Sequence, residues 1–161
     1  HALVSAFPTI AFDQQAQRIA VVTSALDLSS APAMQRYWSG APTPADDCTI
    51  TIYDLRTATR LKLLSGHTAP VLALAFSPSG ATLLSYARNE VRFWAAGGAS
   101  LLSSLLGGTG RCTQTHPLAP CPTNSTTALL SVAVQWEPAQ GKHNPEKASV
   151  VREDGSVCKF A

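Results

Sequence analysis

Short apolar runs alternate with turn-forming residues along most of the chain. No stretch sustains the apolar repeat of an amphipathic helix, whereas short runs of apolar and β-branched residues recur between clusters of Gly, Pro, Asp and Ser. Such runs are typical of β-strands. They predict strands at residues 9–12, 18–23, 48–54, 60–64, 71–76, 82–86, 90–94, 111–115, 129–136, 149–152 and 157–160. The pattern indicates an all-β protein.

The clearest local unit lies in the middle of the chain. Ser77-Pro78-Ser79-Gly80 is a strong turn signal between two of these strands, and the third strand of the unit ends at Trp94. Two segments compete for the fourth strand. Residues 99–106 are consistent with a helical turn or a strand, and residues 111–115 are the alternative that we favour.

Three longer segments interrupt this pattern. Residues 24–47 are rich in Ala, Ser, Pro and Gly, residues 116–127 are rich in Pro, and residues 137–147 are mostly polar. Segments of this composition between strand-like runs are loops. We therefore predict three inserted loops with these bounds.

An internal repeat determines the architecture. Tyr53-Asp54 closes one strand, and Phe93-Trp94 closes the equivalent strand about 40 residues later, the period of a WD repeat. Between them, Gly66-His67 and Pro70 precede an apolar strand that leads into Phe76-Ser77-Pro78-Ser79-Gly80. Five separated features in this order and spacing resemble a WD repeat.

The resemblance implies a β-propeller, in which blades of four antiparallel strands surround a central channel, typically in rings of about four to eight. The predicted strands form about two and three-quarter such blades, at approximately 7–64, 69–115 and 128–161. The expected fold is a partial WD-repeat β-propeller. Because the chain begins at His1 without an initiator Met or a signal segment, we expect the rest of the ring upstream, including a strand that completes the last blade beside residues 157–160.

WD-repeat proteins hold a buried hydrogen-bonded set of a His, a Ser or Thr, an Asp in a turn, and a Trp. The matching residues here are His67, Ser85 and Trp94. The Asp is missing from the short turn Ala87-Arg88-Asn89, so we expect an incomplete network. The corresponding structural positions elsewhere are Asp47, Asp54 and Asp154.

The sequence contains no motif that is typical of catalysis or of cofactor or metal binding. The chain lacks the Gly-x-Ser-x-Gly elbow of a hydrolase, and its run Gly107-Gly108-Thr109-Gly110 lacks the Lys-Ser/Thr of a phosphate loop. The four cysteines form no C-x-x-C pair. We therefore expect a non-enzymatic protein with no catalytic, cofactor-binding or metal site.

Charge and hydropathy exclude two further classes of partner. Only 14% of the 161 residues are charged and the formal net charge is +2, which leaves no basic stripe for a phosphate backbone. The longest apolar runs, residues 71–76 and 128–134, fall far short of the ~20 residues that cross a bilayer. We expect neither nucleic-acid binding nor direct membrane insertion.

A longer order of features extends from residue 69 to residue 160. It comprises Ala69-Pro70-Val71, Phe76-Ser77-Pro78-Ser79-Gly80, Leu84-Ser85-Tyr86, Val91-Arg92-Phe93-Trp94, Ser100-Leu101-Leu102-Ser103-Ser104, Arg111-Cys112, Trp136, Asp154-Gly155 and Phe160. This order resembles the last propeller of the rabconnectin beta-type WD-repeat proteins. The short turn at Arg88 and the insertions at 24–47 and 137–147 depart from that family.

This resemblance implies a cytoplasmic scaffold, peripheral on organelle membranes, that pairs with a second scaffold subunit and regulates assembly of the vacuolar proton ATPase. Its partners are then proteins: the remainder of its own propeller, the second subunit and ATPase subunits. The alternative is a structural WD-repeat subunit of another large assembly, such as a ciliary, axonemal or vesicle-coat complex. A third hypothesis is an enzyme with a propeller-borne active site.

Overall fold

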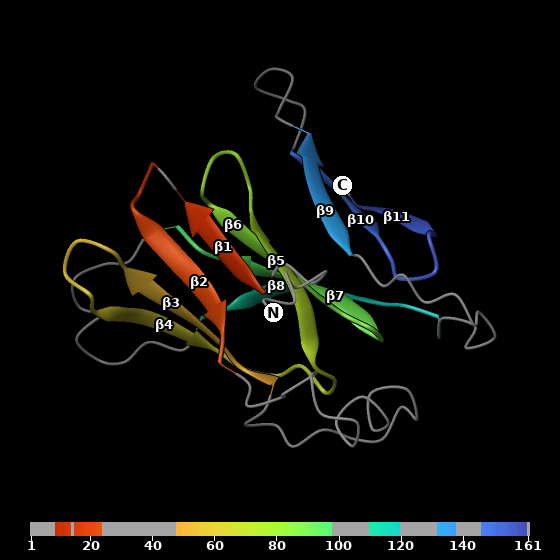
Figure 1. Ribbon diagram of the computed structural model, residues 1–161, viewed down its shortest axis with the longest axis horizontal. Coiled ribbons are helices and arrows are strands. Elements are labelled where there is room, and N and C mark those ends of the chain that lie inside the picture. The colour runs from red at the N-terminus through yellow and green to blue at the C-terminus, as the bar shows by residue number, and fades with distance from the viewer. Residues whose placement is uncertain are drawn as a thin grey trace, which may run out of the picture.

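A computed structural model describes residues 9–13, 15–23, 48–97, 110–119, 132–137 and 146–160. Over these ranges the chain forms eleven β-strands in three antiparallel sheets and no α-helix (Figure 1). The prediction of an all-β fold is confirmed.

Sheet 1 contains the first four strands in chain order: β1 (Ile10–Asp13), β2 (Arg18–Val22), β3 (Ile50–Asp54) and β4 (Arg60–Leu64). Each strand pairs antiparallel with the next, and a register shift between β3 and β4 lies at Ile52 and Tyr53. The insertion predicted at 24–47 lies outside the described residues.

Sheet 2 contains β5 (Val71–Phe76), β6 (Thr82–Ala87), β7 (Glu90–Ala95) and β8 (Cys112–Pro117), again in chain order. The predicted turn between β5 and β6 is closed by a hydrogen bond from the Ser77 amide to the Thr82 carbonyl at 2.9 Å, and Gly80 has a φ of 69°. The fourth strand is the favoured segment, although it runs through Pro117 into the predicted loop. Residues 99–106 lie outside the described ranges.

Sheet 3 has three strands, β9 (Ala133–Glu137), β10 (Lys147–Val151) and β11 (Val157–Phe160), with β10 in the centre. Glu137 and Lys147 are strand residues that pair with each other, so the connection between β9 and β10 is shorter than the predicted insertion. Asp154 and Gly155 form the turn between β10 and β11, where Gly155 has a φ of 80°.

The first strands of the three sheets are neighbours. β5 contacts β1 on one side and β9 on the other, and the remaining strands of each sheet extend away from them (Figure 1). This is the arrangement of consecutive propeller blades, whose first strands line the centre of the ring. The predicted partial propeller, with two four-stranded blades and three strands of another, is confirmed.

Two apolar cores lie on opposite sides of sheet 2. The core shared with sheet 1 contains Ala11, Ala20, Ile50, Ile52, Leu64, Val71, Leu74, Leu83, Trp94 and Ala96, with Phe76 packed against it. The core shared with sheet 3 contains Leu72, Ala73, Leu84, Tyr86, Val91, Phe93, Val132, Ala148 and Val150. Val91 and Phe93 lie on the opposite face of sheet 2 from Trp94, because side chains alternate along β7.

Candidate functional site

A buried chain of hydrogen bonds crosses sheet 2. The indole Nε1 of Trp94 donates to Ser85 Oγ at 2.7 Å, Ser85 Oγ lies 2.7 Å from His67 Nε2, and His67 Nδ1 lies 2.9 Å from Glu90 Oε1. His67, Ser85 and Trp94 are at most 2% exposed. The structure therefore brings together the three residues that the WD-repeat pattern singled out.

The chemistry of the partners assigns the protons. The Glu90 carboxylate only accepts, so His67 Nδ1 carries a hydrogen, and a neutral imidazole then accepts at Nε2. The Ser85 hydroxyl donates to that nitrogen, which leaves its oxygen to accept from Trp94. Each group in this hydrogen-bonded network thus acts as a donor or an acceptor as its neighbour requires.

The prediction that this network would be incomplete is wrong, because Glu90 takes the place of the missing Asp. The two-residue turn Arg88-Asn89 places Glu90 at the first position of β7, opposite Ala87, and its longer side chain reaches His67. Arg92 adds an ion pair to Glu90 at 3.0 Å. The signal that sequence reasoning missed was an acidic residue immediately after a turn that is too short to carry one.

Burial and pairing shift the acidities of the two ionisable members. Burial lowers the pKa of His67; contact with Glu90 opposes this shift and the charge of Arg92 reinforces it. Burial by itself would raise the pKa of Glu90, but the hydrogen bonds from His67 and Arg92 outweigh it and hold that pKa below its ordinary value. At neutral pH the pair is thus a neutral imidazole beside a carboxylate.

Asp54 and Asp154, two of the other predicted structural positions, lie apart from this network. Asp54 ends β3 and accepts from the amides of Arg56 and Thr57, at 2.8 and 3.2 Å, so it caps the following turn. Asp154 accepts from the Ser156 amide at 2.9 Å in the turn before β11. Asp47 lies outside the described residues.

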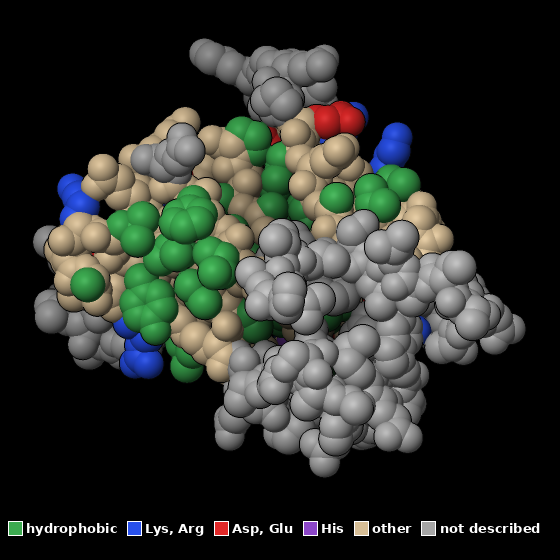
Figure 2. All heavy atoms as spheres, in the orientation of Figure 1, with side chains coloured by type: hydrophobic (Ala, Val, Ile, Leu, Met, Phe, Trp, Pro, Cys, Tyr) green, Lys and Arg blue, Asp and Glu red, His purple; other side chains and the backbone are tan. Residues whose placement is uncertain are grey.

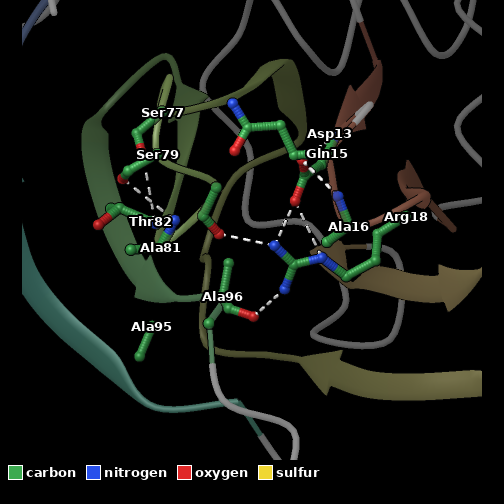
Figure 3. Close-up of polar contacts among 12 residues, drawn as sticks. Asp13, Gln15, Ala16, Arg18, Ser77, Ser79, Ala81, Thr82, Ala95 and Ala96 are labelled. Atoms are coloured by element: carbon green, nitrogen blue, oxygen red, sulfur yellow. Dashed lines mark hydrogen bonds and ion pairs between the residues drawn. The ribbon is translucent and has the colours of Figure 1, made fainter.

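A guanidinium group joins sheet 1 to sheet 2. Arg18, the first residue of β2, is held by Asp13, with Nε 3.0 Å from Asp13 Oδ2. Its Nη2 donates to the Gly80 carbonyl at 2.7 Å and its Nη1 to the Ala96 carbonyl, both in sheet 2 (Figure 3). Burial would raise the pKa of Asp13, but the hydrogen bond and charge of Arg18, with two backbone amides, lower it. Sequence reasoning missed this contact because it joins two sheets.

The contact between sheets 1 and 2 and the turn that contains Gly80 both depend on this residue being a glycine. A Cβ atom at this residue would lie 2.6 Å from Asp13 Oδ2 and 3.1 Å from Arg18 Nη2. Its φ of +69° is also one that residues with a side chain rarely adopt. The turn and the contact between sheets both require glycine here.

A second charged group joins sheet 3 to sheet 2. Arg152 Nη2 donates to the carbonyls of Ala119 and Arg88, at 2.8 and 3.2 Å. The Tyr86 hydroxyl of sheet 2 donates to Glu153 of sheet 3. Burial, with the hydrogen bond to Glu153, raises the pKa of Tyr86, so the phenol stays protonated and remains a donor.

One side of sheet 1 is apolar and faces away from sheet 2. We call it the outer face of sheet 1, and it comprises Ile10, Phe12, Ile19, Val21 and Tyr53, which are cross-strand neighbours in the sheet register. Ile10 is 50% exposed and Phe12 is 62% exposed. Figure 2 shows hydrophobic side chains gathered over β1 and β2. This surface has the character of a protein contact.

The polar groups of the hydrogen-bonded network are enclosed within the fold. Ser85 and His67 are enclosed, so a substrate has no access to the hydroxyl or the imidazole. Among the described residues, no group of His, Cys, Asp and Glu is placed to hold a metal ion. No helix in the same part of the chain is long and apolar enough to cross a membrane.

Comparison with known proteins supports the fold. No family model matches the chain. Its structure is similar to one in the complex of the fission yeast SREBP–SCAP binding domains, with 16% identity and a TM-score of 0.54 over 99% of this chain and 33% of that one. It is also similar to Sqt1 of Saccharomyces cerevisiae, with 11% identity and a TM-score of 0.52 over 96% of this chain and 31% of that one.

The WD40 domain of SCAP from fission yeast is a further match, with 12% identity and a TM-score of 0.49 over 96% of this chain and 31% of that one. The chain therefore spans about a third of the length of the solved structures that it matches. The repeat pattern, the three sheets and the first two similarities together define the fold as that of a WD-repeat β-propeller.

Proposed function

We propose that the chain is part of a protein-interaction scaffold and performs no chemistry of its own. The observation that carries this proposal is the similarity in fold to a chain from the complex of the SREBP–SCAP binding domains, in which the fold serves protein binding. The buried His67, Ser85 and Glu90 are hydrogen-bonded to one another within sheet 2, and Arg18 joins sheet 1 to sheet 2. In a scaffold, such residues stabilise the fold and take no part in a reaction.

The narrower proposal is a regulator of vacuolar proton ATPase assembly, similar to the rabconnectin beta-type proteins. Its support is the order of sequence features from Ala69 to Phe160 given above. On this proposal the protein is cytoplasmic and peripheral on organelle membranes, and its partners are a second scaffold subunit and subunits of the ATPase. A structural WD-repeat subunit of a ciliary, axonemal or vesicle-coat complex is the alternative.

Affinity capture of the intact protein from its own cells, followed by mass spectrometry, tests the two proposals. Recovery of ATPase subunits with a second large scaffold would support the first, whereas axonemal or coat proteins would support the alternative. Turnover of a substrate that is lost in His67→Gln would instead indicate an enzyme and refute the scaffold proposal.

A further inference from the structure

Two cations of sheet 1 bind three consecutive carbonyls at the end of β7 in sheet 2. Arg18 of β2 donates to the Ala96 carbonyl. The Lys62 ammonium of β4 donates to the carbonyls of Ala95 and Gly97, at 2.8 and 3.4 Å. Lys62 therefore takes part in the contact between sheets 1 and 2, although it lies on the edge strand of its own sheet.

The side chain of Lys62 lies at the border of the apolar core that these two sheets share. Lys62 pairs with Ile52 in the register of β3 and β4, and Ile52 is buried in that core. Cross-strand partners share a face of the sheet, so the methylene groups of the lysine begin beside apolar neighbours. Lys62 itself is only partly buried, which leaves it open to small reagents from solvent.

Lys62 has no acidic partner, in contrast to two arginines of the same sheets. Arg18 is paired with Asp13, and Arg92 is paired with Glu90. Within the described part of the chain no carboxylate forms an ion pair with Lys62, and its hydrogen-bond acceptors are neutral carbonyls. Burial, and after it the nearby charge of Arg18, lower the pKa of the Lys62 ammonium.

These surroundings are those of an activated amine. The neutral form of a lysine is the nucleophile, and desolvation beside another cation raises its share at a given pH. A thioester is an acyl donor that reacts with such an amine. The nitrogen attacks the acyl carbon, a C–N bond forms, and the C–S bond breaks. The sulfur leaves with the bonding electron pair and takes up the proton that the nitrogen loses.

We propose that Lys62 is an acylation site for thioester donors, and that its acylation weakens the contact between sheets 1 and 2. Acylation removes the positive charge and leaves one N–H, so the side chain no longer donates separately to Ala95 and Gly97. The amides of Ala96 and Gly97 donate to the Ala81 carbonyl at 2.8 and 3.0 Å and report on this segment. The proposal goes beyond the scaffold function and does not depend on its partners.

Acetylation of the intact protein with S-acetyl-N-acetylcysteamine, a small thioester, tests the site. Mass spectrometry gives the rate at each lysine over a series of pH values, with the exposed Lys159 as the matched control. We expect Lys62 to reach half of its maximal rate at a lower pH than Lys159, and the two profiles to coincide in denaturant. No acetylation at Lys62, or coincident profiles in the folded protein, would overturn the proposal.

Substitutions test the consequence of losing the charge. Lys62→Gln removes the charge as acylation does and should speed amide hydrogen exchange at Ala96 and Gly97. Lys62→Arg keeps the charge and the donors and should leave that exchange slow, as should the control Lys159→Gln. Unchanged exchange in Lys62→Gln, or equal acceleration in Lys62→Arg, would refute the effect on the contact between the sheets. Failure of the scaffold proposal would appear separately, as affinity capture without a protein partner.

Discussion

Each neighbour of sheet 2 binds it through an arginine, Arg18 of sheet 1 and Arg152 of sheet 3, but the apolar packing beside the two guanidinium groups differs. Towards sheet 1, Arg18 makes directed hydrogen bonds to two carbonyls, and Trp94 belongs to a core that includes the small residues Ala11 and Ala20. Towards sheet 3, Phe93 lies among aromatic rings, with centroid distances of 5.7 Å to His116, 6.1 Å to Trp136 and 5.8 Å to Phe160.

This difference shows that one repeat architecture tolerates two kinds of joint. A guanidinium bound to specific carbonyls fixes the position of one sheet on the next, because hydrogen bonds lose strength steeply with misalignment. A cluster of tilted rings derives its stability from buried area and edge-to-face contacts, which allow more than one geometry. The joint with sheet 3 has the aromatic cluster in addition to Arg152, so the joint with sheet 1 should be the more sensitive to substitution.

Trp94→Ala should have the largest effect on the sensitive joint. It removes the largest buried side chain and leaves Ser85 without its donor. We expect a loss of about 3 to 5 kcal/mol in the free energy of unfolding, as for other large deletions in a core. Denaturant unfolding of the intact protein measures it, with Trp94→Phe as a milder control. A loss below about 1 kcal/mol would show that the indole is not part of this core.

Arg18→Met comes next, because it leaves the buried Asp13 carboxylate without its cation. Removing one partner of a buried pair costs about 3 kcal/mol or more, whereas replacing both partners is often nearly neutral. The double variant Asp13→Asn, Arg18→Met should therefore recover most of the stability in the same unfolding measurement. No recovery in the double variant would mean that Arg18 acts through its contacts with the Gly80 and Ala96 carbonyls alone.

Phe93→Leu should have a smaller effect on the tolerant joint. Leucine keeps an apolar side chain but loses the edge-to-face contacts, which are worth about 0.5 to 1.5 kcal/mol beyond buried area. We expect a loss in that range by denaturant unfolding. If Phe93→Leu proves as costly as Arg18→Met, the contrast between the two joints is wrong.

The smallest expected effect is the pH dependence of the His67 network. The pKa of His67 is lowered in the folded protein, so below about pH 6.5, the ordinary value for histidine, the unfolded chain binds more protons. Stability is thus fully present above that pH and declines as the pH falls towards the folded-state pKa. Thermal melts of the intact protein should show this decline, and His67→Gln should flatten it. An identical slope in the variant would assign the dependence to other groups.

The pattern of the sequence predicted the sheets better than it predicted their joints. Strand positions follow from local information, namely apolar alternation and turn residues such as Ser77 to Gly80 and Asp154-Gly155. The network was found only in part, because assigning Glu90 requires the register of β6 on β7. Arg18 and Arg152 bind carbonyls of another sheet. Every residue has a backbone carbonyl, so the sequence does not indicate which one is bound. Those contacts depend on how the sheets pack against one another, which only the structure shows.

Gly80 has a consequence for how this chain can change over evolution. The absence of a Cβ atom at Gly80 meets two independent requirements. It permits a left-handed backbone in the turn, and it leaves space for the Asp13 carboxylate from another sheet. A substitution at Gly80 would damage both, and no single second change elsewhere repairs both, since relaxing the turn does not clear Asp13 and shortening Asp13 does not relax the turn. A position of this kind should stay fixed even where the surrounding loop varies freely.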